Sequence, residues 1–191
     1  MAVALTACEV TGPEEARRQA LLLDTELLFV RYAAGVQPET TQASFWAVHG
    51  ESRALRLRYA GQSELEPPLL EFTVGPLSLL AHPNGLPVLP GDSVLITVTA
   101  DTARFVFDFQ PAGLVFSPVF PATLRVGYAG ADHDFNGDGL INWLDSVIAL
   151  RLQIWTQAAP GLPWLPIPST LAGVEIVQGR VTHFTGFALA D

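Results

Sequence analysis

Apolar and polar residues alternate along much of the chain after Ser44, and this alternation constrains the fold more than any other feature. In Arg53–Tyr59, leucine or tyrosine occupies every second position from Leu55, whereas Arg56 and Arg58 fall on the opposite face of an extended chain. We expect strands at Ser44–His49, Arg53–Tyr59, Leu69–Val74, Leu77–Ala81, Val94–Thr99, Arg104–Phe109, Leu114–Phe116, Ala122–Tyr128 and Gly186–Ala190. Turn-forming Gly and Pro separate these segments, so the pattern predicts a mainly β protein built as an antiparallel β-sandwich.

The charge of the chain argues against nucleic-acid binding. The formal net charge is −9, all ten basic residues are arginine, and they form no basic patch in the sequence. The alternating Arg56 and Arg58 have two interpretations: the solvated face of a sheet, or a row that attracts an anionic partner. Mean hydropathy is high at +0.33. Acidic residues nevertheless interrupt the apolar runs near the N-terminus before they reach the length of a membrane span.

The stretch Asp134–Asp145, of sequence Asp-Phe-Asn-Gly-Asp-Gly-Leu-Ile-Asn-Trp-Leu-Asp, has the ligand spacing of an EF-hand calcium loop. The predicted metal ligands are the side-chain oxygens of Asp134, Asn136, Asp138, Asn142 and Asp145 and the backbone carbonyl of Leu140. Calcium is a hard cation that prefers oxygen ligands, so we expect one structural Ca²⁺. The alternative is a metal-free polar turn, because Asp, Asn and Gly also build turns unaided.

This loop differs from a common EF-hand in two ways. Its last position is Asp145 instead of glutamate, and the residues before it predict a strand instead of an entering helix. Both features resemble the calcium loops of dockerin modules, in which a single helix follows the loop. The resemblance covers residues 132–156, and the chain contains one such repeat. Leu144, Ile148, Leu152 and Trp155 share one face of the helix that we expect next, which Pro160 would end.

The segment 108–128 resembles the Pro-x-Gly-Leu-x-Phe…Pro…Leu-x-x-x-Tyr pattern of the ZU-five domain. Residues 75–85 and the closing His183-Phe-Thr-Gly-Phe-Ala-Leu-Ala190 resemble two further segments of that family. The resemblance implies a β-sandwich that acts as a non-catalytic protein-interaction module. The calcium loop would then be an insertion before the last strands. We expect those strands to include a hairpin of Val174–Val177 and Arg180–Phe184 around Gly179.

The N-terminal Leu5-Thr6-Ala7-Cys8 resembles a bacterial lipobox, which implies lipidation of Cys8. Only seven residues precede Cys8 and none is basic, so the alternative is a lone cysteine in a secreted protein. The lipobox implies a periplasmic or surface lipoprotein of the bacterial cell envelope. The expected parts are a signal remnant at 1–8, a tether or short helix at 9–43 whose helical pattern extends to Val30, and a sandwich domain at 44–191 with the calcium loop and helix inserted at 132–157.

A catalytic site is not expected. Gly91-Asp92-Ser93-Val94 resembles the nucleophile block of the GDSL esterases, but a strand instead of a helix is predicted after Ser93, and the Asp-x-x-His pair of that family is absent. The four histidines show no zinc-binding spacing. We therefore expect a non-enzymatic envelope module that binds an unknown protein. The alternatives are a carbohydrate-associated module that binds a cell-wall or surface glycan, and an esterase using Ser93.

Overall fold

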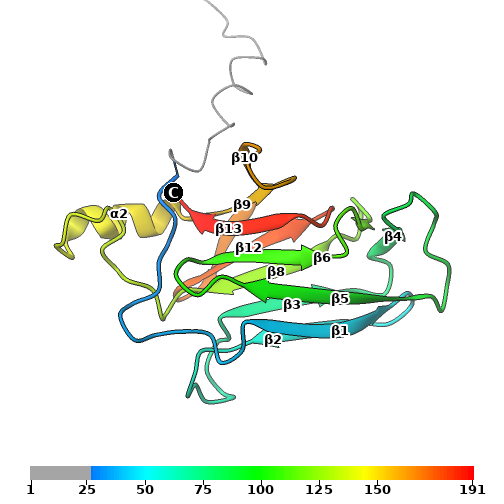
Figure 1. Cartoon of the computed structure of the whole chain (residues 1–191), viewed down its shortest axis with the longest axis horizontal. Coiled ribbons are helices and arrows are strands. Elements are labelled where there is room, and N and C mark those ends of the chain that lie inside the picture. The colour runs from blue at the N-terminus through cyan, green and yellow to red at the C-terminus, as the bar shows by residue number, and fades with distance from the viewer. Residues whose placement is uncertain (1–26) are drawn as a thin grey trace, which may run out of the picture.

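Antiparallel strands make up most of the structure, as the alternation predicted (Figure 1). The computed structural model describes residues 27–191. In spatial order, the strands of the larger sheet are β1 (Gln42–Val48), β5 (Ser93–Ala100), β6 (Val106–Gln110), β13 (Gly186–Ala190), β9 (Gln153–Gln157) and β10 (Trp164–Pro166). The predicted strand that begins at Val94 is confirmed as β5, and Ser93 is its first residue.

A second antiparallel sheet packs against the first. Its strands, in spatial order, are β11 (Ser169–Gly173), β12 (Ile176–Val181), β8 (Ala122–Gly127), β3 (Leu70–Val74) and β2 (Arg53–Leu57). A small pair, β4 (Leu79–Ala81) with β7 (Val115–Phe116), completes the strands of the described region. The helix α2 (Trp143–Arg151) lies at one end of the sandwich, and β4 lies at the opposite end (Figure 1).

Aromatic rings from the two sheets meet in the core. Phe72 of β3 contacts Phe109 of β6 with the ring centroids 5.1 Å apart, and Phe184 lies 5.1 Å from Phe109. Phe105, Phe107 and Phe109 are all fully buried. The aromatic alternation of Phe105 and β6 therefore serves core packing, and it joins the two sheets into one sandwich.

The helix is shorter than the sequence predicted. It ends at Arg151, and Trp155 lies in β9, where its indole N–H donates to the carbonyl of Ala190. Apolar residues spaced three and four apart do not distinguish a long helix from a helix followed by a buried strand. Residues 153–157 form a strand because they pair with β13. Within residues 27–191, no helix combines the length and the apolar character that crossing a bilayer requires.

The predicted hairpin around Gly179 is also wrong. Gly179 lies inside β12, which continues from Ile176 to Val181. A Cβ at this position would come within 2.7 Å of Cδ1 of Ile167, so this glycine allows close packing within the strand and does not form a turn. The hairpin instead joins β11 to β12, and its turn includes Glu175 at a φ of +53°.

The first described residues are extended, although the sequence analysis allowed a helix as far as Val30. Phe29 pairs with Ala190, and the backbones of Leu28 and Asp191 exchange two hydrogen bonds. The side chain of Asp191 also forms an ion pair with Arg151 at the end of α2. Asp191 thus connects this segment to the helix. Residues 9–26 of the expected tether, and Cys8, lie outside the described residues.

Candidate functional site

The predicted calcium loop lies between β8 and α2 and is folded around the carboxylate of Asp134. One oxygen of Asp134 accepts the backbone N–H of Asp138 at 3.1 Å, and the other accepts that of Gly139 at 2.7 Å. Gly137 and Gly139 have φ angles of +71° and +84°, which favour glycine. The two glycines let the chain bend sharply around the first predicted ligand.

The next two predicted ligands lie close to each other on the same loop. The side-chain oxygen of Asn136 accepts the N–H of Asp138 at 3.0 Å, and the Asn136 amide nitrogen donates to the carboxylate of Asp138 at 2.9 Å. The other oxygen of Asp138 accepts the N–H of Leu140 at 2.8 Å. The structure therefore brings Asp134, Asn136 and Asp138 together, as their spacing predicted.

The last predicted ligand, Asp145, is buried and connects the beginning of the loop to its end. Its side chain is only 2% exposed. One carboxylate oxygen accepts the N–H of Phe135 at 2.8 Å and that of Asn136 at 3.4 Å, and the other accepts the N–H of Asn142 at 2.8 Å. Each carboxylate oxygen can accept two bonds, so Asp145 retains some acceptor capacity for a cation.

Asn142 begins the helix. Its side-chain oxygen accepts the N–H of Leu144 at 2.9 Å, and the reciprocal bond from its own N–H to Asp145 completes a capping box. The Asn142 amide nitrogen donates to the carbonyl of Leu140 at 3.2 Å. Leu140 and Asn142, the two remaining predicted ligands, are thus engaged with each other and with the helix. The sequence analysis missed this capping role, although the Asn-x-x-Asp spacing is a recognisable signal for it.

The chemistry of the loop fits a hard cation. It carries three carboxylates, and within residues 27–191 none of them forms an ion pair with a basic group. Arg31 and Arg104 line a hollow beside the loop together with Asp134, so positive charge is nearby. In the described part of the chain, no three His, Cys, Asp or Glu side chains converge as a ready metal-binding group. A cation here would therefore depend on amide and carbonyl oxygens as well as carboxylates.

Packing connects the loop and the helix to the sandwich core. Ile148 of α2 and Leu152 just after it are buried in the main core. Phe135 of the loop packs edge-on against Tyr128 and His133, with ring centroids 6.2 and 5.6 Å away. His133 directly precedes the loop, and its Nε2 lies 2.9 Å from a carboxylate oxygen of Glu175. Rigidity imposed on the loop would thus be transmitted to the ends of β8 and α2.

Acid should weaken this closure of the loop. The backbone N–H of Asn142, followed by those of Asn136 and Phe135, holds the pKa of Asp145 below its usual value, and burial opposes this effect. Because the pKa is lower in the folded state, the stabilisation from Asp145 is present above the unfolded pKa of about 4 and is lost as the pH falls through the folded value. Urea unfolding without calcium at pH 6, 4 and 3 should show a larger loss of stability in the wild type than in Asp145→Asn. Equal losses would contradict this role.

The remaining predicted site residues are separate from the loop. Ser93 is exposed at the start of β5, and in the described residues no hydrogen bond joins its hydroxyl to a histidine. Arg56 lies on the solvent-facing side of β2, as expected for alternate positions of a strand. Arg58 follows the end of β2. The structure therefore does not gather the serine, the arginines and the loop into one site.

Fold and loop together define an antiparallel β-sandwich with a polar, acidic loop and one helix inserted between two of its strands. Comparison with protein-family models, with curated proteins and with solved structures gave no match to this chain.

Proposed function

We propose that this chain is a non-catalytic, calcium-stabilised β-sandwich that binds another protein at the bacterial cell envelope. The observation that carries the proposal is the loop 134–145, in which carboxylate and amide oxygens surround a sharp double-glycine bend. Oxygen atoms at these spacings, on three carboxylates that form no ion pair within the described residues, suit Ca²⁺. The resemblances to the ZU-five domain and to the lipobox around Cys8 support the interaction role and the envelope location.

The calcium ion would act on structure and not on chemistry. Asp134, Asn136 and Asp138 would supply side-chain oxygens, Leu140 its carbonyl, and Asn142 and Asp145 the oxygens next to the helix. The ion would offset the mutual repulsion of the three carboxylates and hold α2 in place against the core. Leu140 and Asn142 would have to exchange their present mutual hydrogen bond for contact with the ion.

An exposed apolar surface beside the loop supports binding to a protein. Ile141, Trp143 and Leu150 are 72%, 71% and 71% exposed, although all three are large and apolar. Val147 on the same helix is 41% exposed. Apolar residues gathered on one short segment are typical of interaction sites in soluble proteins. Calcium would therefore give a fixed shape to the segment that presents them.

Isothermal titration of chelator-treated full-length protein with CaCl₂ tests the metal site. We expect one ion per chain, with a Kd in the range of about 10⁻⁶ to 10⁻³ M, and weaker binding of Mg²⁺, which prefers a stricter octahedral geometry. Asp138→Asn should weaken binding by about tenfold or more, because affinity depends on the number of charged ligands.

The matched control is Asp92→Asn. Asp92 also accepts a backbone N–H within a turn, from Leu89 at 2.8 Å, but it lies outside the loop. Its variant should bind calcium like the wild type. If wild-type protein releases no binding heat and shows no saturation up to millimolar calcium, residues 134–145 are a polar turn and the metal part of the proposal is wrong.

A further inference from the structure

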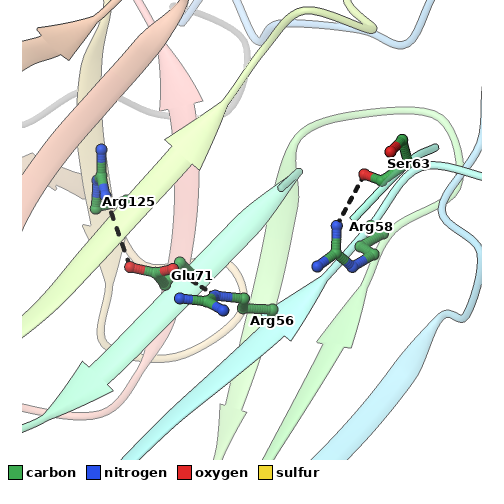
Figure 2. Close-up of polar contacts among 5 residues, drawn as sticks. All are labelled: Arg56, Arg58, Ser63, Glu71 and Arg125. Carbon is green, nitrogen blue, oxygen red and sulfur yellow. Dashed lines mark hydrogen bonds and ion pairs between the residues drawn. The ribbon is translucent and has the colours of Figure 1, made fainter. Parts of the chain in front are cut away.

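A groove lies on the outer face of the second sheet and shares no lining residue with the calcium loop. It has a volume of about 300 Å³ and runs between strands β2, β3 and β8 and the loop at residues 63–68. Arg56, Arg58 and Arg125 line it, together with Glu71 (Figure 2). Arg56 and Arg58 are the row for which the sequence analysis left an anionic partner open.

Strand register brings the charged groups of the groove together. Arg56 pairs with Glu71 across β2 and β3, and Glu71 pairs with Arg125 across β3 and β8. Nε of Arg56 lies 2.6 Å from one carboxylate oxygen of Glu71, and Nη1 of Arg125 lies 3.6 Å from the other (Figure 2). One carboxylate is thus shared by two guanidinium groups, which leaves positive charge in excess at this point.

Two of the arginines keep unused hydrogen-bonding capacity. Nε of Arg125 is buried and has no hydrogen-bond partner, and its side chain is only 37% exposed. Arg58 donates from Nη1 to the backbone carbonyl of Ser63 at 3.1 Å, and no carboxylate lies within ion-pair distance of it in the described residues (Figure 2). A guanidinium group has five N–H donors arranged to receive a carboxylate with two parallel bonds. Because Nε of Arg125 is shielded from solvent, an incoming carboxylate would find its unmatched donors on Arg58.

The wall of the groove is held in place before any ligand arrives. The side chain of Gln62 donates to the carbonyl of Pro67 at 2.7 Å and accepts the N–H of Tyr59 at 3.2 Å. The loop also passes so close to β8 that a Cβ at Gly127 would lie 2.5 Å from the carbonyl oxygen of Pro68. A fixed wall reduces the ordering cost of binding.

The other groups that line the groove select among anions. Glu64 and Glu66 stand in the wall, so with Glu71 the groove contains as many carboxylates as arginines. A long polyanion would be repelled by the two wall glutamates, whereas a single carboxylate can reach the guanidinium group of Arg58 (Figure 2). Leu65 is 96% exposed, and Ile176 also lines the groove, so an apolar group beside the carboxylate would be accommodated. A peptide with one acidic side chain next to an apolar residue matches both features.

We propose that this groove binds an acidic peptide segment of a protein partner, with the carboxylate of its Asp or Glu held by Arg58 and an adjacent apolar side chain against Leu65. The inference rests on the proposed role in protein interaction, but it is independent of calcium.

Pull-down of fluorescein-labelled hexapeptide libraries by the immobilised full-length chain tests the proposal. One library has a fixed glutamate flanked by leucine and random residues, and its twin has glutamine at the fixed position. We expect retention of the glutamate library only. Selected peptides should bind Arg58→Gln at least tenfold more weakly than the wild type. Arg53→Gln is the matched control, because Arg53 lies on the same strand but pairs with Glu51 outside the groove.

The outcomes separate this inference from the calcium proposal. Equal retention of both libraries, or unchanged affinity in Arg58→Gln, would overturn it. Displacement of the bound peptides by oligogalacturonate at a concentration below the Kd of the peptides would also overturn it. Arg58→Gln removes only a hydrogen bond to the backbone carbonyl of Ser63, so the variant should fold like the wild type. Each measurement is made with calcium and with EGTA. Peptide binding in both solutions supports the groove regardless of the titration result, and loss of peptide binding leaves the metal site untouched.

Discussion

Adding 1 mM CaCl₂ to chelator-treated protein is expected to raise its Tm by about 5–11 °C. For a Kd of about 10⁻⁵ M, this concentration is about 100 times Kd and stabilises the folded state by about 2.7 kcal/mol. In a domain of this size, each kcal/mol corresponds to about 2–4 °C. The gain arises because only the folded chain brings Asp134, Asn136 and Asp138 together. Differential scanning calorimetry of the full-length chain measures it.

The specificity of this shift is the decisive part of the measurement. Magnesium at the same concentration should give a clearly smaller rise, and the double variant Asp134→Asn/Asp138→Asn should lose the response to calcium. Asp92→Asn should keep it. A rise of the same size in the double variant would show that calcium acts elsewhere on this acidic chain. Saturable binding by titration without any rise in Tm would mean that the ion does not favour the folded state.

Phe72→Ala is expected to lower the free energy of unfolding by about 3–5 kcal/mol, the range for truncation of a buried phenylalanine. Phe72 is fully buried at the centre of the aromatic core. Its ring contacts those of Phe109, Phe116 and Phe184, with centroid distances of 5.1, 5.9 and 5.3 Å. Alanine would leave a cavity between the two sheets, where neighbouring rings cannot all move to fill it. Equilibrium unfolding in urea measures the loss.

The control for this prediction is Phe120→Ala. Phe120 is 52% exposed, so removing its ring should change stability by no more than about 0.5 kcal/mol. The denaturant dependence of the free energy should stay the same in both variants, because the surface exposed on unfolding is nearly unchanged. A loss below 1 kcal/mol for Phe72→Ala would mean that the two sheets do not share the tightly packed core described here.

Most strands could be predicted because their evidence is local. Alternation of apolar and polar residues is visible within six or seven residues, as in β5, where burial follows it closely. The errors arose where distant residues decide the structure. Gly179 resembles a turn residue, yet it lies inside β12, where its lack of a side chain lets Ile167 of a neighbouring segment pack closely. Trp155 continues a helical spacing, yet pairing with β13 makes its segment a strand.

The loop shows the same division between local and distant causes. The closeness of Asp134, Asn136 and Asp138 in the folded chain could be predicted from their spacing, since each accepts a hydrogen bond from a residue two to five positions later. The burial of Asp145 could not be predicted, because it depends on how α2 packs on the core. The groove was less predictable still. Arg56 and Arg58 are visible as a row, but Arg125 reaches them only through the pairing of three strands.

Asp191 lies where a mechanical force applied to the first described residues would act first. Its backbone holds Leu28 by two hydrogen bonds, and its side chain holds Arg151 at the end of α2. If a pull were applied through the residues that precede Leu27, it would reach this junction before it reached the aromatic core. The first element to yield would then be the β-bridge at Phe29. Tension on the chain would thus detach this segment from the end of β13, while α2 stayed attached to the core through Ile148 and Leu152.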